Sequence, residues 1–497
     1  MAASSHPAAP TAPADRATAD NDFAAVDPAH LEALGAIVGA EHLLVDDAAR
    51  DRYGRDETER LCFPPAAIVR PADTDQVARI LALAHDARLP VTPRGAGTGL
   101  SGGALPVHGG LVLTVERLDR IRAIDTRDLV AVAESGVVVG NLQRAVEAEG
   151  LFYPPDPGSK DMSLLGGNLA ENAAGPRSCK YGATGAWVLG LEAVLADGRR
   201  IDTGGRNRKD VAGYDLARLL IGSEGTLAVI TAATLRLIGR PAATLTLLLP
   251  FPDLESAAAA VEAIFRAGHD PAACELMEEN ALDAVGAVME LPPQLRGHRA
   301  VMLLELHAGA ALRKEAGDDP SDELLERAAA IAALAEELGA GEAIAAEDIA
   351  DQERLWAIRR KTGEAVKHRS VYKEADAVVP RSKLAELVRA ARAVAAAHGL
   401  EAICYGHAGD GNLHVNLLRG SLDDDAWEAR RDAAEQELFE RVVALGGSVT
   451  GEHGIGYSQR AYLPLVRSPA ALEVMRAIKR SFDPRGILNP GKIFTDG

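Results

Sequence analysis

Apolar residues in the first half of the chain fall in short runs that predict strands, with two amphipathic helical stretches between them. From Ala67 the order is "AIVRP", a helix opened by "PADTD", and then "LPVTPRG", "GLVLTV", "IRAID" and "LVAVAESG". A second helix, "VVVGNLQRAVEAEG", ends at Gly150, and "VLGLEAVLADGRRID" predicts a hairpin with Asp197 and Gly198 at its turn. The pattern predicts a mixed α+β domain that ends near Arg240.

Beyond Arg240, strands alternate with longer amphipathic helices. The runs "TLTLLLP", "AACELM" and "AVMLLELHA" are separated by helices that start near Asp253 and Ser321, which predicts a smaller sheet with helices on one face. The stretch "EAICYGHAGDGNLHVNLL" predicts a closing hairpin, and the rest is mostly helical. We therefore divide the chain into a disordered tail, two folded domains and a helical C-terminal region: 1–23, 24–240, 241–420 and 421–497.

The loop that follows the apolar run at Leu89 is unusually rich in glycine. Gly97, Gly99 and Gly102 match the letters of the G-x-G-x-x-G dinucleotide fingerprint, which requires a helix to open at its third glycine. Pro106 and further glycines follow instead, so the Rossmann interpretation fails on context. What remains is a loop of backbone N–H groups suited to an anionic diphosphate, with a plain surface connection as the alternative.

Composition excludes some classes of partner and leaves others open. The formal net charge of −19 speaks against nucleic acid, which requires a basic surface, and against a general affinity for anionic membranes. No apolar run approaches the ~20 residues of a membrane span, and the N-terminus lacks the apolar segment of a signal peptide. The four cysteines form no CxxC pair and are typical of a reduced protein, so we expect a cytoplasmic location, with peripheral membrane attachment left open.

The predicted C-terminal hairpin places histidines together. In "LHVNL" the apolar residues face a core, whereas His414 and Asn416 share the other face, and His407 lies just before the turn. Further on, "TGEHGIG" sets Glu452 and His453 between glycines, where the chain can turn sharply. Two imidazoles and a carboxylate suit an open site for Zn, Mn or Fe, and surface histidines in turns are the alternative.

Taken together, these segments resemble one family. "GHAGDGNLHVN", "GEHGIG" and "FDPRGILNPGKI" are similar to the C-terminal motifs of FAD-linked D-2-hydroxyacid dehydrogenases, which include D-lactate dehydrogenase, the glycolate oxidase catalytic subunit and D-2-hydroxyglutarate dehydrogenase. "PRGAGTGLSGG", "PPDPGSKDMSLLGGNLAENAAGPRSCKYG" and "GSEGTLAVIT" resemble its FAD domain. The resemblance implies an α+β fold: a vanillyl-alcohol-oxidase (PCMH-type) FAD-binding domain over 24–240, a ferredoxin-like substrate or cap domain over 241–420, and a C-terminal region over 421–497 that completes the active site.

By the same resemblance, the glycine-rich loop and two later segments hold FAD. The first loop has no His or Cys before Gly103, so we expect non-covalent FAD, and Cys179 leaves a covalent link as the alternative. The residues expected to contact FAD are Arg94, Gly95, Ala96, Gly97, Thr98, Gly99, Leu100, Ser101, Gly102, Pro155, Gly158, Gly167, Asn168, Asn172, Gly175, Tyr181, Gly182, Glu224, Gly225, Ile230 and Asn489.

The resemblance also assigns roles at the substrate. His453 matches the family's catalytic base, Asn416 a substrate-contacting Asn, and Arg359 an Arg that binds the substrate carboxylate, with a solvated helix face as the alternative for Arg359. A divalent metal, Zn or Mn, is expected on the residues that match the family's ligands: His407, His414 and Glu452.

Two positions depart from the hydroxyglutarate enzymes. Those enzymes carry a Thr four residues after the Arg and a Lys two before the Asp of the next strand, where this chain has Gly363 and Glu374, with Thr362 and Lys373 one place off. We therefore expect a D-lactate-like substrate, with D-2-hydroxyglutarate dehydrogenase or a glycolate oxidase subunit as alternatives. A non-redox enzyme like alkyl-glycerone-phosphate synthase and a non-catalytic flavoprotein subunit also remain open. The expected electron acceptor is a quinone, a cytochrome or an electron-transfer flavoprotein, and a homodimer is compatible with the sequence.

Overall fold

The computed structural model describes residues 23–58, 61–309 and 320–495, so nearly all of the predicted tail lies outside the described residues. The first region holds two main sheets. One has the strand order β1-β2-β4-β3 with β2, β4 and β3 parallel, and the other is antiparallel with the order β5-β6-β10-β8-β9. The strands are β1 (Leu43–Leu44), β2 (Ala67–Val69), β3 (Val91–Arg94), β4 (Leu111–Thr114), β5 (Ile121–Asp125), β6 (Val130–Glu134), β7 (Leu151–Phe152), β8 (Val188–Val194), β9 (Arg200–Gly204), β10 (Val229–Arg236) and β11 (Ile238–Gly239).

The two helices predicted for this region are present as α3 (Thr74–Ala87) and α4 (Val139–Ala148), and the structure adds further helices that were not predicted. In α3 the Asp73 side chain caps the first turn by accepting the N–H of Gln76, and the buried face packs on the parallel sheet. The expected hairpin is confirmed, since β8 and β9 pair across Asp197 and Gly198. The other helices of this region are α1 (Pro28–Val38), α2 (Asp47–Tyr53), α5 (Leu165–Glu171), α6 (Ser178–Tyr181) and α7 (Leu216–Leu220).

The second region is built on one antiparallel sheet of seven strands in the described residues, in the order β15-β12-β14-β13-β17-β18-β16. The expectation of a smaller sheet with helices on one face is wrong on both counts. Both sheet faces are apolar, and helices cover each. One core cluster includes α8 (Leu254–Arg266), α10 (Pro320–Glu337), α12 (Leu384–Ala397) and α13 (Asp424–Ala444), and another includes α9 (Glu279–Gly286) and α11 (Ile349–Arg369). The strands are β12 (Thr244–Phe251), β13 (Ala273–Glu278), β14 (Ala300–His307), β15 (Ile344–Ala346), β16 (Tyr372–Val378), β17 (Glu401–His407) and β18 (Asn412–Leu418).

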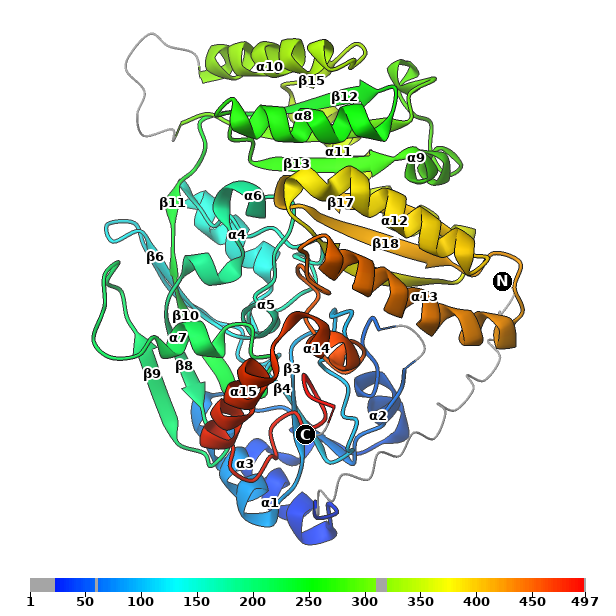
Figure 1. The fold of residues 1–497 in the computed structure, drawn as a ribbon. Coiled ribbons are helices and arrows are strands. Elements are labelled where there is room, and N and C mark those ends of the chain that lie inside the picture. The colour runs from blue at the N-terminus through cyan, green and yellow to red at the C-terminus, as the bar shows by residue number, and fades with distance from the viewer. Residues whose placement is uncertain (1–22, 59–60, 310–319, 496–497) are drawn as a thin grey trace, which may run out of the picture.

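The C-terminal part of the chain connects the two regions. It leaves the second sheet through α13 and returns to the first region, where Leu488 forms a parallel bridge with Val91 beside the parallel sheet (Figure 1). The described part of the chain contains no helix long and apolar enough to cross a membrane. The remaining helices are α14 (Leu463–Val466) and α15 (Pro469–Phe482).

Candidate active site

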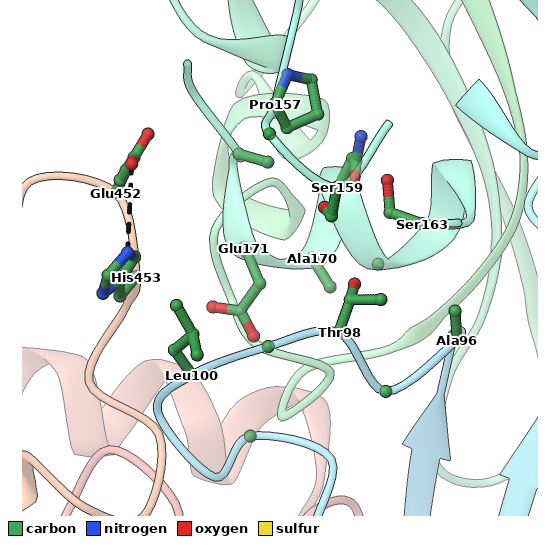
Figure 2. Close-up of a pocket in the computed structure, with 18 of the residues that line it drawn as sticks. Ala96, Thr98, Leu100, Pro157, Ser159, Ser163, Ala170, Glu171, Glu452 and His453 are labelled. Atoms are coloured by element: carbon green, nitrogen blue, oxygen red, sulfur yellow. Dashed lines mark ion pairs between the residues drawn. The ribbon is translucent and has the colours of Figure 1, made fainter. Parts of the chain in front are cut away.

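A single cavity of about 770 Å³ lies between the two regions. Its wall on the first region is formed by the loop Gly95–Leu100 and by α5 (Figure 2), together with the turn at Glu224. Its wall on the second region is formed by one face of α11, by side chains of β16, β17 and β18, and by the turn that carries Glu452 and His453. The cavity therefore joins the predicted diphosphate loop to the predicted metal and substrate residues.

The glycine-rich loop takes a shape that side chains would disturb. Gly97 has a φ of +78°, and a Cβ there would lie 2.0 Å from the Arg94 guanidinium, which folds beneath the loop. Gly95 packs against Gly167 at the start of α5, where a Cβ would lie 3.4 Å from the Gly167 backbone. No helix opens at Gly102. The loop thus presents backbone to the cavity without a Rossmann helix, which fits a bound diphosphate.

The residues expected to contact FAD divide into two groups. Arg94 to Leu100, Gly158, Gly167, Asn168, Glu224, Gly225 and Ile230 line the cavity. The others lie behind its wall: Ser101, Gly102, Pro155, Asn172, Gly175, Tyr181, Gly182 and Asn489.

Residues behind the wall hold the loops in place. Asn489 donates its amide to the carbonyls of Gly103 and Glu224, and Tyr181 bonds His307 at 2.8 Å. His307 also bonds Glu305 at 2.7 Å, so the aromatic residue on α6 is tied to β14 of the second region. Contact of any of these residues with FAD stays a prediction.

Two buried carboxyl groups border the cavity beneath the loop. Glu224 accepts the backbone N–H groups of Ile455 and Gly456 at 2.8 and 2.6 Å, whereas Oε2 of Glu171 has no hydrogen-bond partner among the described residues. Burial raises the pKa of both carboxyl groups, and that of Glu171 the more, since Glu224 lies beside it. Protonation of Glu171 is therefore easier than that of a carboxyl group in water, which suits the neighbourhood of an anionic cofactor.

The predicted metal ligands converge on one point of the cavity. Oε1 of Glu452 lies 3.1 Å from Nε2 of His407 and 3.5 Å from Nε2 of His414, and the two imidazole rings are nearly perpendicular. Their ligand atoms all lie within 4.8 Å of one another, a spacing and donor set that fit a divalent ion. Burial lowers the pKa of His407, but Glu275 and Glu452 together raise it to about 10. The cluster therefore attracts a cation, whether a proton or a metal ion.

Asp376 fixes the turn that aims Glu452 and His453 into the cavity. Its Oδ2 accepts the backbone N–H groups of Gly451, Glu452 and His453 at 2.7–2.8 Å, and the hydroxyl of Thr450. Burial opposes its charge, but the nearby histidines and these donors hold the pKa of Asp376 well below its usual range. The turn is thus held by a buried carboxylate on β16, which sequence analysis did not identify.

Glu275 links the metal cluster to the predicted substrate arginine. This fully buried residue of β13 contacts Nδ1 of His407 at 2.7 Å and Nε of Arg359 at 2.6 Å. Burial disfavours its charge, yet His407 and Arg359 lower the pKa of Glu275 to about 2. The Arg359 side chain is only 12% exposed and stacks over Tyr405, so it is not part of a solvated helix face.

The structure shows where the residues lie at the two positions that depart from the hydroxyglutarate enzymes. Thr362 is fully buried and donates its hydroxyl to the carbonyl of Ile358, and Lys373 pairs with Glu435. Neither side chain therefore takes the place that the Thr or the Lys has in the hydroxyglutarate enzymes. Gly363 and Glu374 line the cavity instead.

Two other expected residues lie off the cavity. Asn416 is fully buried and does not line it, so its contact with substrate stays a prediction. Cys179 also lies off the cavity, with its thiol near the carbonyls of Pro271 and Ala272, and burial raises its pKa.

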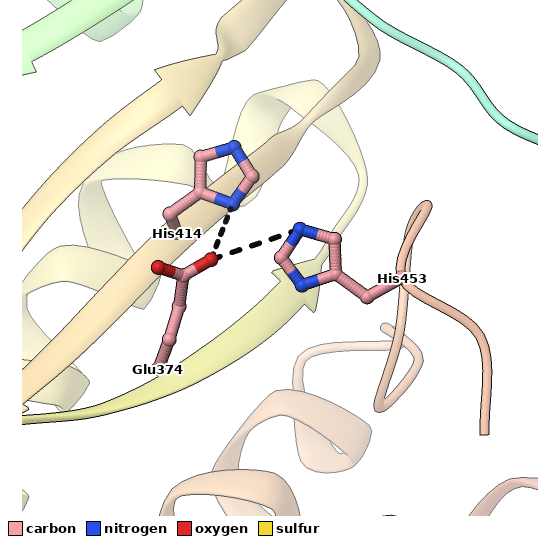
Figure 3. A group of neighbouring side chains, drawn as sticks. All are labelled: Glu374, His414 and His453. Atoms are coloured by element: carbon pink, nitrogen blue, oxygen red, sulfur yellow. Dashed lines mark ion pairs between the residues drawn. The ribbon is translucent and has the colours of Figure 1, made fainter. Parts of the chain in front are cut away.

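Glu374 belongs to the site although the motifs did not identify it. Its Oε1 lies 3.5 Å from Nδ1 of His414 and 3.7 Å from Nε2 of His453 (Figure 3). A signal was present in the sequence: in β16, Glu374 and Asp376 alternate onto one face, and their partners across the ladder are Asn416 and His414 of β18.

The fold and this cavity define a flavoprotein of the vanillyl-alcohol-oxidase or PCMH class. Two family models match the chain: "FAD linked oxidases, C-terminal domain" over 240–493 and "FAD binding domain" over 65–204. Among solved structures, p-cresol methylhydroxylase matches with a TM-score of 0.76, 17% identity and coverage of 93% of this chain and 96% of the other. An alkyldihydroxyacetonephosphate synthase matches with a TM-score of 0.73, 19% identity and coverage of 94% and 86%. These two likenesses show the fold.

Curated relatives define the group more closely. The glycolate oxidase subunit GlcD of Bacillus subtilis is 38% identical over 93% of this chain and 96% of its own length. A D-lactate dehydrogenase of Archaeoglobus fulgidus is 40% identical over 89% and 95%, and a D-2-hydroxyglutarate dehydrogenase of Stutzerimonas stutzeri is 33% identical over 94% and 99%. The chain belongs to this family of FAD-linked oxidoreductases, the D-lactate, glycolate and D-2-hydroxyglutarate dehydrogenase group.

Proposed function

We propose that the protein is an FAD-dependent dehydrogenase that oxidises a small D-2-hydroxyacid, with D-lactate as the first candidate, to the 2-oxo acid. The observation that carries the proposal is the single cavity that has the glycine-rich loop at one end and His407, His414, Glu452 and His453 at the other. A non-catalytic flavoprotein subunit would not need this second set of residues. D-2-Hydroxyglutarate and glycolate remain the alternatives that the curated relatives support.

The residues present fit both expected groups. The loop Gly95–Leu100 would hold the diphosphate of a non-covalently bound FAD, since no cysteine lines the cavity and its histidines all lie at the opposite end. His407, His414 and Glu452 would hold a divalent ion, Zn or Mn. When bound, FAD supplies the hydride acceptor and the ion supplies positive charge that lowers the pKa of the substrate hydroxyl.

The chain's own residues would orient the substrate and take its proton. Glu275 bonds Nε of Arg359, which leaves the two terminal nitrogens of the guanidinium for the carboxylate of the acid. Nε2 of His453 faces the cluster and would accept the hydroxyl proton. Burial lowers the pKa of His453, but Asp376, Glu374 and Glu452 raise it above its ordinary value overall, which strengthens it as a base. We expect kcat/KM to rise with pH as His453 loses its proton.

The remaining parts of the proposal concern the surroundings of the enzyme. Reduced FAD must pass its electrons to an acceptor, for which a quinone, a cytochrome or an electron-transfer flavoprotein is expected. We also expect a homodimer. The expected location is cytoplasmic, and peripheral attachment to a membrane is the alternative. The acidic net charge of −19 supports the absence of nucleic-acid partners.

An anaerobic screen of the purified holoenzyme tests the proposal. D-Lactate should bleach the flavin and L-lactate should not. A much larger kcat/KM for D-2-hydroxyglutarate would overturn the small-acid choice and leave the dehydrogenase class intact. The structural likeness to alkyldihydroxyacetonephosphate synthase keeps a non-redox flavoenzyme as the second candidate, and flavin that no hydroxyacid bleaches would favour it.

A further inference from the structure

Glu374 places a carboxylate without a basic partner in the part of the cavity that faces the substrate. In the described part of the chain its ion contacts are only with His414 and His453, and no Lys or Arg pairs with it. Its side chain is 20% exposed, so water screens its charge only partly. Figure 3 shows its carboxylate pointing between the two imidazole rings.

The basic side chains around Glu374 are occupied or remote. Arg359 is paired with Glu275, Arg360 with Glu353, and Lys373 with Glu435. Lys367 lines the cavity but is exposed, so solvent weakens its field at the interior. Arg359 shares its Nε with Glu275 and keeps its terminal nitrogens for the one carboxylate that the proposed function requires. The basic side chains named above therefore leave no buried cation for a second carboxylate beside Glu374.

We propose that Glu374 determines substrate specificity by excluding acids that carry a second carboxylate, so that the substrates are monocarboxylic D-2-hydroxyacids with an uncharged side chain. The inference rests on the proposed function, because it concerns the same site. Oε1 of Glu374 lies 3.7 Å from Nε2 of His453 and 3.5 Å from Nδ1 of His414, so an acid held between His453 and the metal cluster would have this carboxylate beside it. A second carboxylate there would meet a like charge that water screens only partly, which is unfavourable, whereas a methyl or ethyl group would not.

The test compares two acids of similar size, D-malate and D-2-hydroxybutyrate, which differ in the charge at the end of the side chain. Wild type should favour D-2-hydroxybutyrate in kcat/KM. Glu374→Gln keeps the shape and removes the charge, so it should raise the malate-to-hydroxybutyrate ratio by at least about tenfold. Glu374→Ala should move the ratio in the same direction. The matched control is Glu364→Gln on α11, which lines the same cavity but is 65% exposed, and it should leave the ratio within about twofold.

Three results would overturn the inference. One is an unchanged ratio in both Glu374 variants that retain FAD. Another is an equal change of the ratio in Glu364→Gln, because the total negative charge of the cavity, and not the carboxylate of Glu374 in particular, would then determine the preference. The third is loss of bound metal in Glu374→Gln, which would make Glu374 a ligand beside His414 and His453. A wild-type flavin that neither acid nor D-lactate reduces would instead overturn the proposed function, and with it this inference.

Discussion

The two ends of the cavity are built from different parts of the chain. At the first region the loop Gly95–Leu100 presents mostly backbone, and its shape depends on positions that carry no side chain. At the second region the site consists of charged side chains from β13, β16, β17, β18 and one turn, each held by another charge. We infer that the first end is sensitive to added side-chain atoms, and the second to lost charges.

The largest expected effect separates the base from the metal ligands at the charged end. His453→Ala should keep metal and FAD yet lower kcat by ~10²–10⁴, the usual contribution of a positioned acid–base group. His407→Ala or His414→Ala should lower bound metal and activity together, because one of three protein ligands is lost. Metal analysis and stopped-flow flavin reduction on the same variants provide the measurement. If His453→Ala loses its metal as well, His453 is a ligand and the assigned roles are wrong.

A second prediction removes one charge that supports both His407 and Arg359. Glu275→Gln keeps the shape of the side chain but cannot hold both partners as a carboxylate does, so bound metal and kcat/KM should each fall about 10- to 100-fold. The rise in KM for D-lactate should exceed the loss in kcat, since Arg359 binds the substrate.

The control for Glu275→Gln is Glu278→Gln on the same strand. Glu278 is equally buried, but it pairs with Arg392 and accepts the backbone N–H of Cys404 instead of contacting His407 and Arg359. Metal titration and steady-state kinetics on both variants provide the measurement. Equal losses of bound metal and of kcat/KM in the two variants would show that only the stability of β13 had been changed.

A third prediction concerns the backbone end. Gly97→Ala forces an L residue to a φ of +78° and crowds Arg94, which should cost about 1–2 kcal/mol of stability. Gly99→Ala is the matched control, because a Cβ there has no described atom within 4 Å. Thermal unfolding of the FAD-free proteins should show a lower Tm for Gly97→Ala alone. A Tm equal to that of wild type would contradict the view that glycine is required for the shape of this loop.

The smallest expected effect depends on pH. Because the pKa of Glu171 is raised in the folded protein, the unfolded chain releases a proton that the folded chain keeps once the pH exceeds the ordinary value of 4.5. The contribution of Glu171 to the stability of the wild type should therefore fall as pH rises above that value. Glu171→Gln does not titrate, so its free energy of unfolding should exceed that of wild type, by an amount that grows with pH. Denaturant unfolding at several pH values measures the difference, and a gap that does not change with pH would refute the raised pKa of Glu171.

The same contrast explains what sequence analysis could predict. The loop at the first end was identified because Gly97, Gly99 and Pro106 leave a visible mark on the sequence, and His407, His414, Glu452 and His453 because they lie in recognisable motifs. The strands of both regions followed from apolar spacing. The helices on both faces of the second sheet could not be predicted in this way, because alternation shows that a strand is buried without showing what covers it.

The missing site residues share a physical property. Glu275, Glu374 and Asp376 are acidic residues inside ordinary strands, and their importance arises from partners far away in the sequence. Glu275 meets His407 only because β13 pairs with β17 in the sheet. Propensity and local spacing contain no information on that pairing, whereas the alternation of Glu374 and Asp376 in β16 was a local signal that could have been used.

The central claim is that a D-2-hydroxyacid bound at the charged end gives its hydride to FAD held at the backbone end. Anaerobic stopped-flow mixing of the holoenzyme with D-lactate, and with D-lactate deuterated at C2, tests it most directly. The account predicts rapid bleaching of the flavin by D-lactate and slower bleaching by the deuterated acid, because the C2 hydrogen is the one transferred. A flavin spectrum that stays unchanged with D-lactate and with every other D-2-hydroxyacid would contradict it.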